Sequence, residues 1–275
     1  MIKNILKLTF ILLFLGGQVN CQIIDSALIK ATYNFIYRPD STNSNLTRND
    51  VMILEIGNNV SKFYSYYRYM RDSIIKAQIE GQHKMEQSKL LMDMRGIAKN
   101  GSSTVIYRDN KSNIYTVIAS LGLSTYLLKD SVKDLKWNIL EDTSNILGYL
   151  CTKAFTRFRG RDYEAWFTNQ IPVSCGPYKF GNLPGLVLDI KELKGNFEYK
   201  LLSLELYKNK NPIVFEKSKF IIVSRNKLKK LVKLMIEDPF AFAASQGMTL
   251  TTKTVNGIST LPPPKKIAYN PIELK

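Results

Sequence analysis

Residues 176–190, GPYKFGNLPGLVLDI, carry the most explicit turn and strand signals in the chain. Within them, Leu183-Pro184-Gly185-Leu186 places Pro-Gly between two apolar residues. Proline sets φ to about −65° at the first central position of a turn, and glycine allows the positive φ that a type II turn needs at the second. Asn182, directly before them, tolerates the left-handed region. The stretch therefore predicts a type II turn followed by a strand from Leu186.

Strand-like runs separated by short turns extend in both directions from this stretch. They cover residues 27–37, 51–56, 60–66, 104–108, 114–120, 123–128, 137–140, 149–158, 163–168, 186–191, 198–207 and 219–223. Helical periodicity appears only at about 67–99, where Gly81 interrupts it, and at 227–236, which Ser224 or Asn226 could cap and Pro239 ends. This pattern predicts a mainly β (α+β) fold, a large curved antiparallel sheet with one or two packing helices.

The first 21 residues have the features of a signal peptide. Lys3 and Lys7 precede an apolar run at residues 8–15, which is shorter than the roughly 20 residues that span a bilayer. We expect cleavage before Gln22 rather than lipidation of Cys21, since the residues before it are not the small ones a lipoprotein peptidase prefers. We expect no transmembrane helix after signal removal, and export to the periplasm or the outer membrane.

The rest of the chain is predicted to form one β-rich domain at residues 22–258, with the helical insertion at about 67–99. A proline-rich extended tail follows at residues 259–275. A hydrophobic content of 45% argues against disorder, and the net charge of +16 predicts attraction to anionic material. Nucleic acid is not an expected partner of an exported protein.

Two cysteines, Cys151 and Cys175, remain after signal removal. An oxidising compartment permits a disulfide between them, and a predicted hairpin separates them along the chain. Two buried free thiols are an equal alternative, because unpaired cysteine is often buried.

The motif order between Trp137 and Ile190 resembles the GLPGLI family of exported bacterial proteins. The resemblance runs from Gly148–Ala154 through Phe158–Arg161 and Ala165–Phe167 to a final motif made by Gly176, Pro177, Leu183, Pro184, Gly185 and Leu186. Asn182 and Val187 replace the family's first glycine and its isoleucine. The resemblance implies export and a core block at residues 137–190, but no reaction. The predicted architecture is also similar to the half-barrel of lipoprotein-localisation carriers, which wraps apolar cargo.

Candidate binding residues lie beside the hairpin turn at Gly160. Guanidinium groups at Arg159 and Arg161 could bind a carboxylate or phosphate, or pair with neighbouring acids on a solvated turn. Tyr163 and Trp166 could line a ligand groove, although strand alternation places at least one such ring in the core. We take Arg159, Arg161, Tyr163 and Trp166 as candidate ligand- or partner-binding residues.

Catalytic side chains are scarce. His83 is the only histidine, so no Ser-His-Asp arrangement and no typical zinc site can be assembled around the core block. We therefore expect no cofactor, no metal and no enzymatic activity. The four carboxylates near the core block leave a carboxylate pair as an alternative: Asp162, Glu164, Asp189 and Glu192.

The sequence thus predicts a non-enzymatic exported protein that binds an apolar or lipidic ligand or an envelope partner such as an outer-membrane protein. One alternative is an accessory protein of outer-membrane uptake or secretion machinery. The other is a carboxylate-dependent hydrolase.

Overall fold

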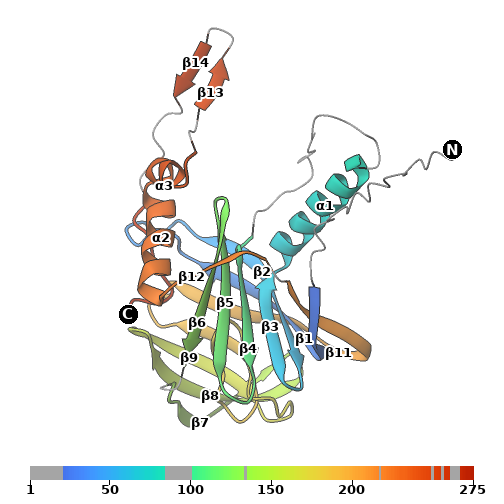
Figure 1. Cartoon of the computed structure of the whole chain (residues 1–275). Helices are drawn as coiled ribbons and strands as arrows, with labels where there is room; N and C mark the ends of the chain where they lie inside the picture. The colour runs from blue at the N-terminus through green and yellow to red at the C-terminus, as the bar shows by residue number, and fades with distance from the viewer. Residues whose placement is uncertain are drawn as a thin grey trace, which may run out of the picture.

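The computed structural model of the chain describes residues 21–83, 101–132, 135–216, 218–248, 251–254, 257–260 and 267–275 (Figure 1). Its elements in chain order are β1 (Cys21–Tyr37), β2 (Arg48–Gly57), β3 (Val60–Ser65), α1 (Tyr66–His83), β4 (Thr104–Asp109), β5 (Ile114–Leu121), β6 (Ser124–Ser131), β7 (Asn138–Ile146), β8 (Tyr149–Phe158), β9 (Arg161–Thr168), β10 (Leu186–Glu192), β11 (Phe197–Glu216), β12 (Phe220–Ile222), α2 (Arg225–Glu237), α3 (Pro239–Ser245), β13 (Thr251–Thr254) and β14 (Gly257–Thr260). Residues 1–20, residues 84–99 of the predicted insertion and Pro262–Pro264 lie outside this description.

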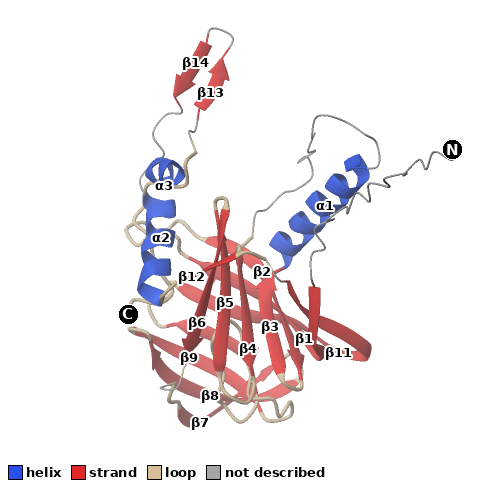
Figure 2. Cartoon of the chain, viewed as in Figure 1, coloured by secondary structure: helices blue, strands red, loops and turns tan. Residues whose placement is uncertain are grey.

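Strands dominate the described residues (Figure 2). Twelve of them form one sheet in the order β12-β6-β5-β4-β3-β2-β1-β11-β10-β9-β8-β7, while β13 and β14 pair separately. The strands of the large sheet are antiparallel except for the parallel β12–β6 pair. The predicted fold class, a large curved and mainly antiparallel sheet that does not close, is confirmed.

The sheet has two arms that meet at its centre. Each arm is built from hairpins, β2 to β6 on one side and β7 to β10 on the other. They are joined by the pairing of β1 with β11, in which residue 21 lies opposite residue 216 and residue 37 opposite residue 197. Alternating burial along β3 and β5 shows that one face of the sheet is packed inward.

The two arms also come together across the concave face. The segment 169–185, which connects β9 to β10, contacts strands of the opposite arm. Tyr115 of β5 donates a hydrogen bond to the carbonyl of Lys179 at 3.2 Å, and Arg108 of β4 donates to the carbonyl of Ser174. Trp137, beside β7, donates its indole N–H to the Gly181 carbonyl at 2.7 Å. This segment therefore fills the space that an unclosed sheet would leave open.

The helices lie at the rim of the sheet. Helix α2 stands beside β6 and β12, and α1 projects past the end of β3 (Figure 1). Ser224 caps α2 by accepting a hydrogen bond from the Lys227 N–H at 3.3 Å, as predicted, and Asp238 and Pro239 begin the unpredicted α3. Within the described ranges, none of the helices has the length and apolar character needed to cross a membrane.

The turn at Pro184-Gly185 differs from its prediction. Asn182 is in the left-handed region, with φ of 65°, as expected. Gly185 does not have the positive φ of a type II turn, so that part of the prediction is wrong. Glycine is required there for space instead, because an added Cβ would lie 2.0 Å from the Thr168 carbonyl oxygen.

We predict that Gly185→Ala destabilises the protein by about 1–3 kcal/mol, since the new methyl group must displace the Thr168 backbone. Urea denaturation of the purified chain measures this change. Gly148→Asn is the control, because an added Cβ at Gly148 meets nothing within 4 Å and asparagine tolerates its positive φ. Equal free energies of unfolding for the two variants would show that the close approach to Thr168 is not the reason why position 185 must be glycine.

Candidate functional site

A cleft of about 440 Å³ lies on the concave side of the sheet. It is bounded by strands β1 to β6 and β11, by residues 178–179 of the 169–185 segment, by the α2 face that carries Leu228 and Val232, and by residues 269–273 of the C-terminal segment. Its floor is apolar, with Met52, Phe63 and Val117 among the side chains that face it. Most ligand sites are concave and largely apolar with a few polar groups, so this cleft is the candidate functional site.

Four aromatic rings line one wall of the cleft in nearly parallel planes. Phe35 of β1 lies at the centre, with its ring centroid 4.3 Å from that of Tyr199 and 4.9 Å from that of Tyr37. The fourth ring, Phe197, is 6.4 Å away on the same side. The rings meet because β1 and β11 are paired here, with residue 35 opposite residue 199. We call these four residues the aromatic wall.

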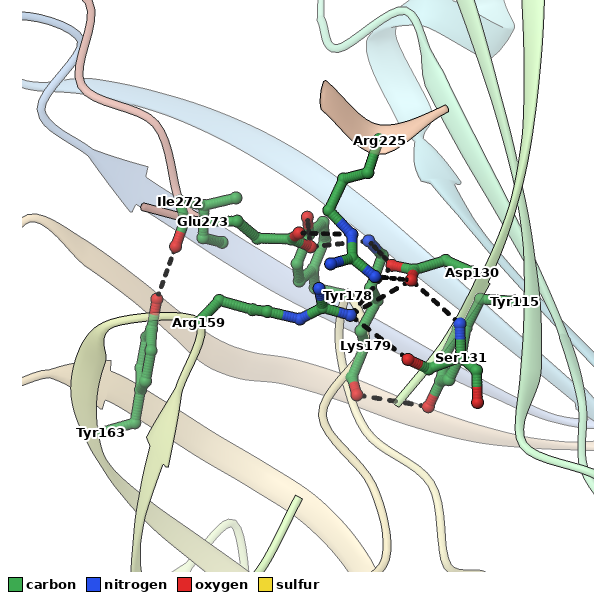
Figure 3. Close-up of polar contacts among 10 residues, drawn as sticks. All are labelled: Tyr115, Asp130, Ser131, Arg159, Tyr163, Tyr178, Lys179, Arg225, Ile272 and Glu273. Carbon is green, nitrogen blue, oxygen red and sulfur yellow. Dashed lines mark hydrogen bonds and ion pairs between the residues drawn. The ribbon is translucent and has the colours of Figure 1, made fainter. Parts of the chain in front are cut away.

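A cluster of five acidic and basic side chains lies beside the cleft, and we call it the Asp130 cluster (Figure 3). Its members come from β6, the 169–185 segment, the β8–β9 turn, α2 and the C-terminal segment: Asp130, Lys179, Arg159, Arg225 and Glu273.

Asp130 is at the centre of this cluster, with a side chain only 1% exposed. Its carboxylate accepts from the Lys179 ammonium at 2.9 Å, from Arg159 at 3.1 Å, and from Arg225. Lys179 also pairs with Glu273 at 2.6 Å. Three cations therefore share two carboxylates in a space largely closed to water.

The cluster keeps the Asp130 carboxyl ionised. Burial alone would raise the pKa of the Asp130 carboxyl, but the charge of Lys179 and hydrogen bonds from Lys179 and Arg225 hold that pKa below its usual value. Burial and then the charge of Glu273 raise the pKa of Tyr178. Tyr178 therefore keeps its proton, and its hydroxyl donates a hydrogen bond to the Glu273 carboxylate at 2.6 Å.

Residues 267–275 are held against the concave side by side chains of β9 and backbone groups of the β8–β9 turn. Arg161 donates to the Pro271 carbonyl at 2.7 Å and to the Asn270 side chain at 2.6 Å, and Glu192 neutralises its charge at 3.1 Å. The Leu274 N–H donates to the Arg159 carbonyl at 2.9 Å. This segment is thus part of the cleft wall rather than a free tail.

The four residues predicted to bind a ligand or partner do not form one surface. Arg159 belongs to the Asp130 cluster, and Arg161 holds the C-terminal segment. Tyr163 is buried and donates to the Ile272 carbonyl at 3.3 Å. Trp166 projects from the other face of β9, where the Lys153 ammonium lies 5.0 Å from its ring. Three of the four therefore contact the chain's own segments, and their role in ligand binding stays a prediction.

The two remaining cysteines are free thiols in the structure, and both are buried. Cys151 Sγ lies 3.4 Å from the Tyr149 carbonyl oxygen, whereas Cys175 Sγ lies 3.5 Å from Ser61 Oγ. Burial raises the pKa of the Cys151 thiol to about 11, so it is not an activated nucleophile.

The four carboxylates considered for hydrolysis do not converge in the cleft. Asp162 lies 3.7 Å from Arg157, and Glu164 pairs with Lys191 at 3.2 Å. Asp189 accepts the Leu201 N–H at 2.9 Å, and Glu192 is paired with Arg161. Among the described residues, no group of three or more His, Cys, Asp or Glu side chains could hold a metal ion.

Sequence reasoning missed the Asp130 cluster. Lys179 lies inside the quoted 176–190 stretch, but only its turn residues were interpreted. Asp130, Arg225 and Glu273 each stand in ordinary charged surroundings, and no spacing connects them.

Comparison with known proteins identifies the family of this chain. The family described as N-glycanase peptide, N-terminal domain, matches residues 84–228, more than half of the chain. The chain belongs to this family. Two solved structures of PNGF-II, in space groups P21 and C2, are similar to it at 17% identity, with TM-scores of 0.48 and 0.46. They match 74% and 73% of this chain but only 33% and 31% of their own, so the chain spans about a third of their length. No curated protein matches it.

The family match corrects two predictions. The GLPGLI assignment is wrong, because residues 84–228 include the whole block 137–190 on which it rested. A short Leu-Pro-Gly-Leu motif serves a local backbone requirement and does not by itself define a family. The predicted function, a non-enzymatic binder of lipid or of an envelope partner, is wrong as well, because the family implies a glycan-related function. Neither alternative gains support. The family is compatible with export.

We predict that Asp130→Asn lowers the free energy of unfolding by about 3–5 kcal/mol, because it leaves buried cations without their shared anion. Chemical denaturation at neutral pH measures the loss. Asp162→Asn is the control, since that carboxylate is 52% exposed and its pairing with Arg157 is worth about 1 kcal/mol or less. Similar losses in both variants would mean that the cluster contributes no more than a surface ion pair.

The lowered pKa of Asp130 also predicts a pH dependence. A carboxyl whose pKa is lower in the folded state stabilises that state above its unfolded pKa, and the stabilisation disappears as pH falls through the folded value. The stability gap between the native chain and Asp130→Asn should therefore be constant near neutral pH and narrow below the ordinary value of 3.8. Denaturation curves at several pH values test this, and a gap that widens in acid would contradict it.

Proposed function

We propose that the chain is a glycan-recognition domain that holds the N-linked glycan of a glycoprotein in the concave cleft. The family match at residues 84–228 carries the proposal, since it connects the chain to N-glycans. The geometry of the cleft supports the choice of surface.

The aromatic wall suits the apolar faces of sugar rings. Hexoses present patches of C–H groups that pack flat against aromatic rings, and an aromatic side chain supplies a large contact area at low entropic cost. Tyr37 is half-buried and ends the wall, with its neighbour Phe35 on one side at 4.9 Å. The wall therefore offers Tyr37 as the ring on which a sugar can stack.

Polar groups around the cleft suit sugar hydroxyls. Asp50, Ser102, Ser103, Asn270 and Glu273 are among the residues that line it. Such groups fix the orientation of a ligand whose main contact is apolar.

The proposed role is binding and not cleavage of the glycan–asparagine bond. Hydrolysis requires an acid or base that is free to exchange a proton with the substrate. The two carboxylates lining the cleft are both engaged: Asp50 accepts from Ser65 at 2.8 Å and from the Ser102 N–H at 2.7 Å, and Glu273 pairs with Lys179. We therefore assign no bond cleavage to this cleft.

The proposal includes an exported location, in the periplasm or associated with the outer membrane. Fractionation of the native cells tests this, and recovery of the chain in the cytoplasmic fraction would contradict it.

We expect a neutral biantennary N-glycan to bind the purified chain in isothermal titration calorimetry. Tyr37→Ala should weaken binding about tenfold, the equivalent of 1.4 kcal/mol, because it removes the terminal ring of the aromatic wall. Trp166→Ala is the control, since its ring lies on the opposite face of the sheet. Thermal unfolding verifies that both variants are folded. Absence of glycan binding, or a loss in Trp166→Ala and not in Tyr37→Ala, would reject the proposal.

A further inference from the structure

The charges that line the cleft are unequal. Among the described residues that line it, four are basic (Lys179, Arg225, Lys229 and Lys275) and two are acidic (Asp50 and Glu273). The Asp130 cluster at its edge shows the same excess, with three cations to two carboxylates. An excess of positive charge along a cleft attracts a ligand that brings a negative charge.

Arg225 is the member of the cluster that remains open to a ligand. Its side chain is 37% exposed, whereas those of Asp130 and Lys179 are at most 3% exposed. One edge of its guanidinium is bonded to Asp130. Its Nε atom is buried and forms a long ion pair with Glu273, at 3.9 Å. The exposed part of a guanidinium can bind a carboxylate or phosphate group.

The start of α2 adds to this positive potential. Arg225 is the first residue of the helix, whose first turn contains no acidic residue. The N-terminal end of a helix carries a partial positive charge, and here nothing on the first turn neutralises it. Lys229, one turn further along, lines the same cleft and donates to the Leu274 carbonyl.

From these observations we infer that the cleft selects acidic N-glycans, and that Arg225 and Lys229 bind the anionic group of the sugar. The inference rests on the proposed function and names the substrate class of the same site. The shared chemistry is a negatively charged oxygen group, either the carboxylate of a sialic acid or a sugar phosphate. The aromatic wall then holds the neutral part of the same glycan.

The test compares two pairs of N-glycans by calorimetry on the whole chain. One pair is a disialylated biantennary glycan and its desialylated counterpart, and the other is a phosphorylated high-mannose glycan and its dephosphorylated form. We expect at least one acidic glycan to bind about tenfold more tightly than its neutral partner at low salt. The advantage should shrink in 0.5 M NaCl, where charges are screened over about 4 Å. The two acidic arms distinguish a sialic acid from a phosphate.

Two variants test the residues. Arg225→Gln and Lys229→Gln should each reduce the ratio of acidic to neutral affinity towards one. Arg225 also forms an ion pair with Asp130, so Arg225→Gln could unfold the protein. In that case Lys229→Gln alone tests the inference. Arg157→Gln is the control with an unchanged ratio, since Arg157 is 71% exposed and is not among the residues that line the cleft. Equal binding of acidic and neutral glycans would overturn this inference and leave the proposed function intact, whereas no binding of any glycan would remove both.

Discussion

The Asp130 cluster is the interaction on which the rest of the structure depends. Asp130 lies on β6, next to one end of the twelve-stranded sheet, whereas Arg159 lies in the turn between β8 and β9, close to the other end. The 3.1 Å contact between their side chains therefore connects the two arms without a backbone hydrogen bond. Lys179, Arg225 and Glu273 bring the connecting segment, α2 and the C-terminal segment to the same point. An open sheet thereby acquires a fixed curvature and a cleft of fixed shape.

This arrangement gives the hairpin arginines two different tasks. Arg159 joins the two arms of the sheet, and Arg161, whose charge Glu192 neutralises, holds backbone carbonyls of the C-terminal segment. Both side chains are largely buried, so their charges serve the shape of the cleft. Arg225 differs because it stands on a helix at the rim and keeps part of its guanidinium accessible. The same residue type thus supplies both the scaffold and an accessible charge at the rim.

The sequence predicted those parts of the fold that depend on neighbouring residues. Gly57-Asn58-Asn59 marks the hairpin between β2 and β3, and the polar run after Asp109 marks the one between β4 and β5, because turn residues stand beside the strands they join. The cleft could not be predicted from the sequence, because its residues are far apart along the chain. The charged residues that line it are spread between residues 50 and 275, and the groups that dock the C-terminal segment include backbone carbonyls, which leave no side-chain pattern. The Pro-Gly motif was conspicuous in the sequence, but its glycine is there because the Thr168 backbone leaves no space for a side chain. The motif therefore led to the wrong family.

The pairing of β1 with β11 has a consequence for how this protein reaches its native state. These strands form the middle of the sheet, yet residue 21 pairs with residue 216. The hairpins of each arm can form from local sequence, but the arms cannot join until nearly two hundred residues are available and the loop between them has been closed. Non-local strand pairing of this kind is associated with folding in milliseconds to seconds rather than microseconds. β1 pairs with β2, and β10 pairs with β11, as neighbours along the chain. During that interval the facing edges of β1 and β11 are therefore the unpaired ones, and unpaired strand edges favour aggregation.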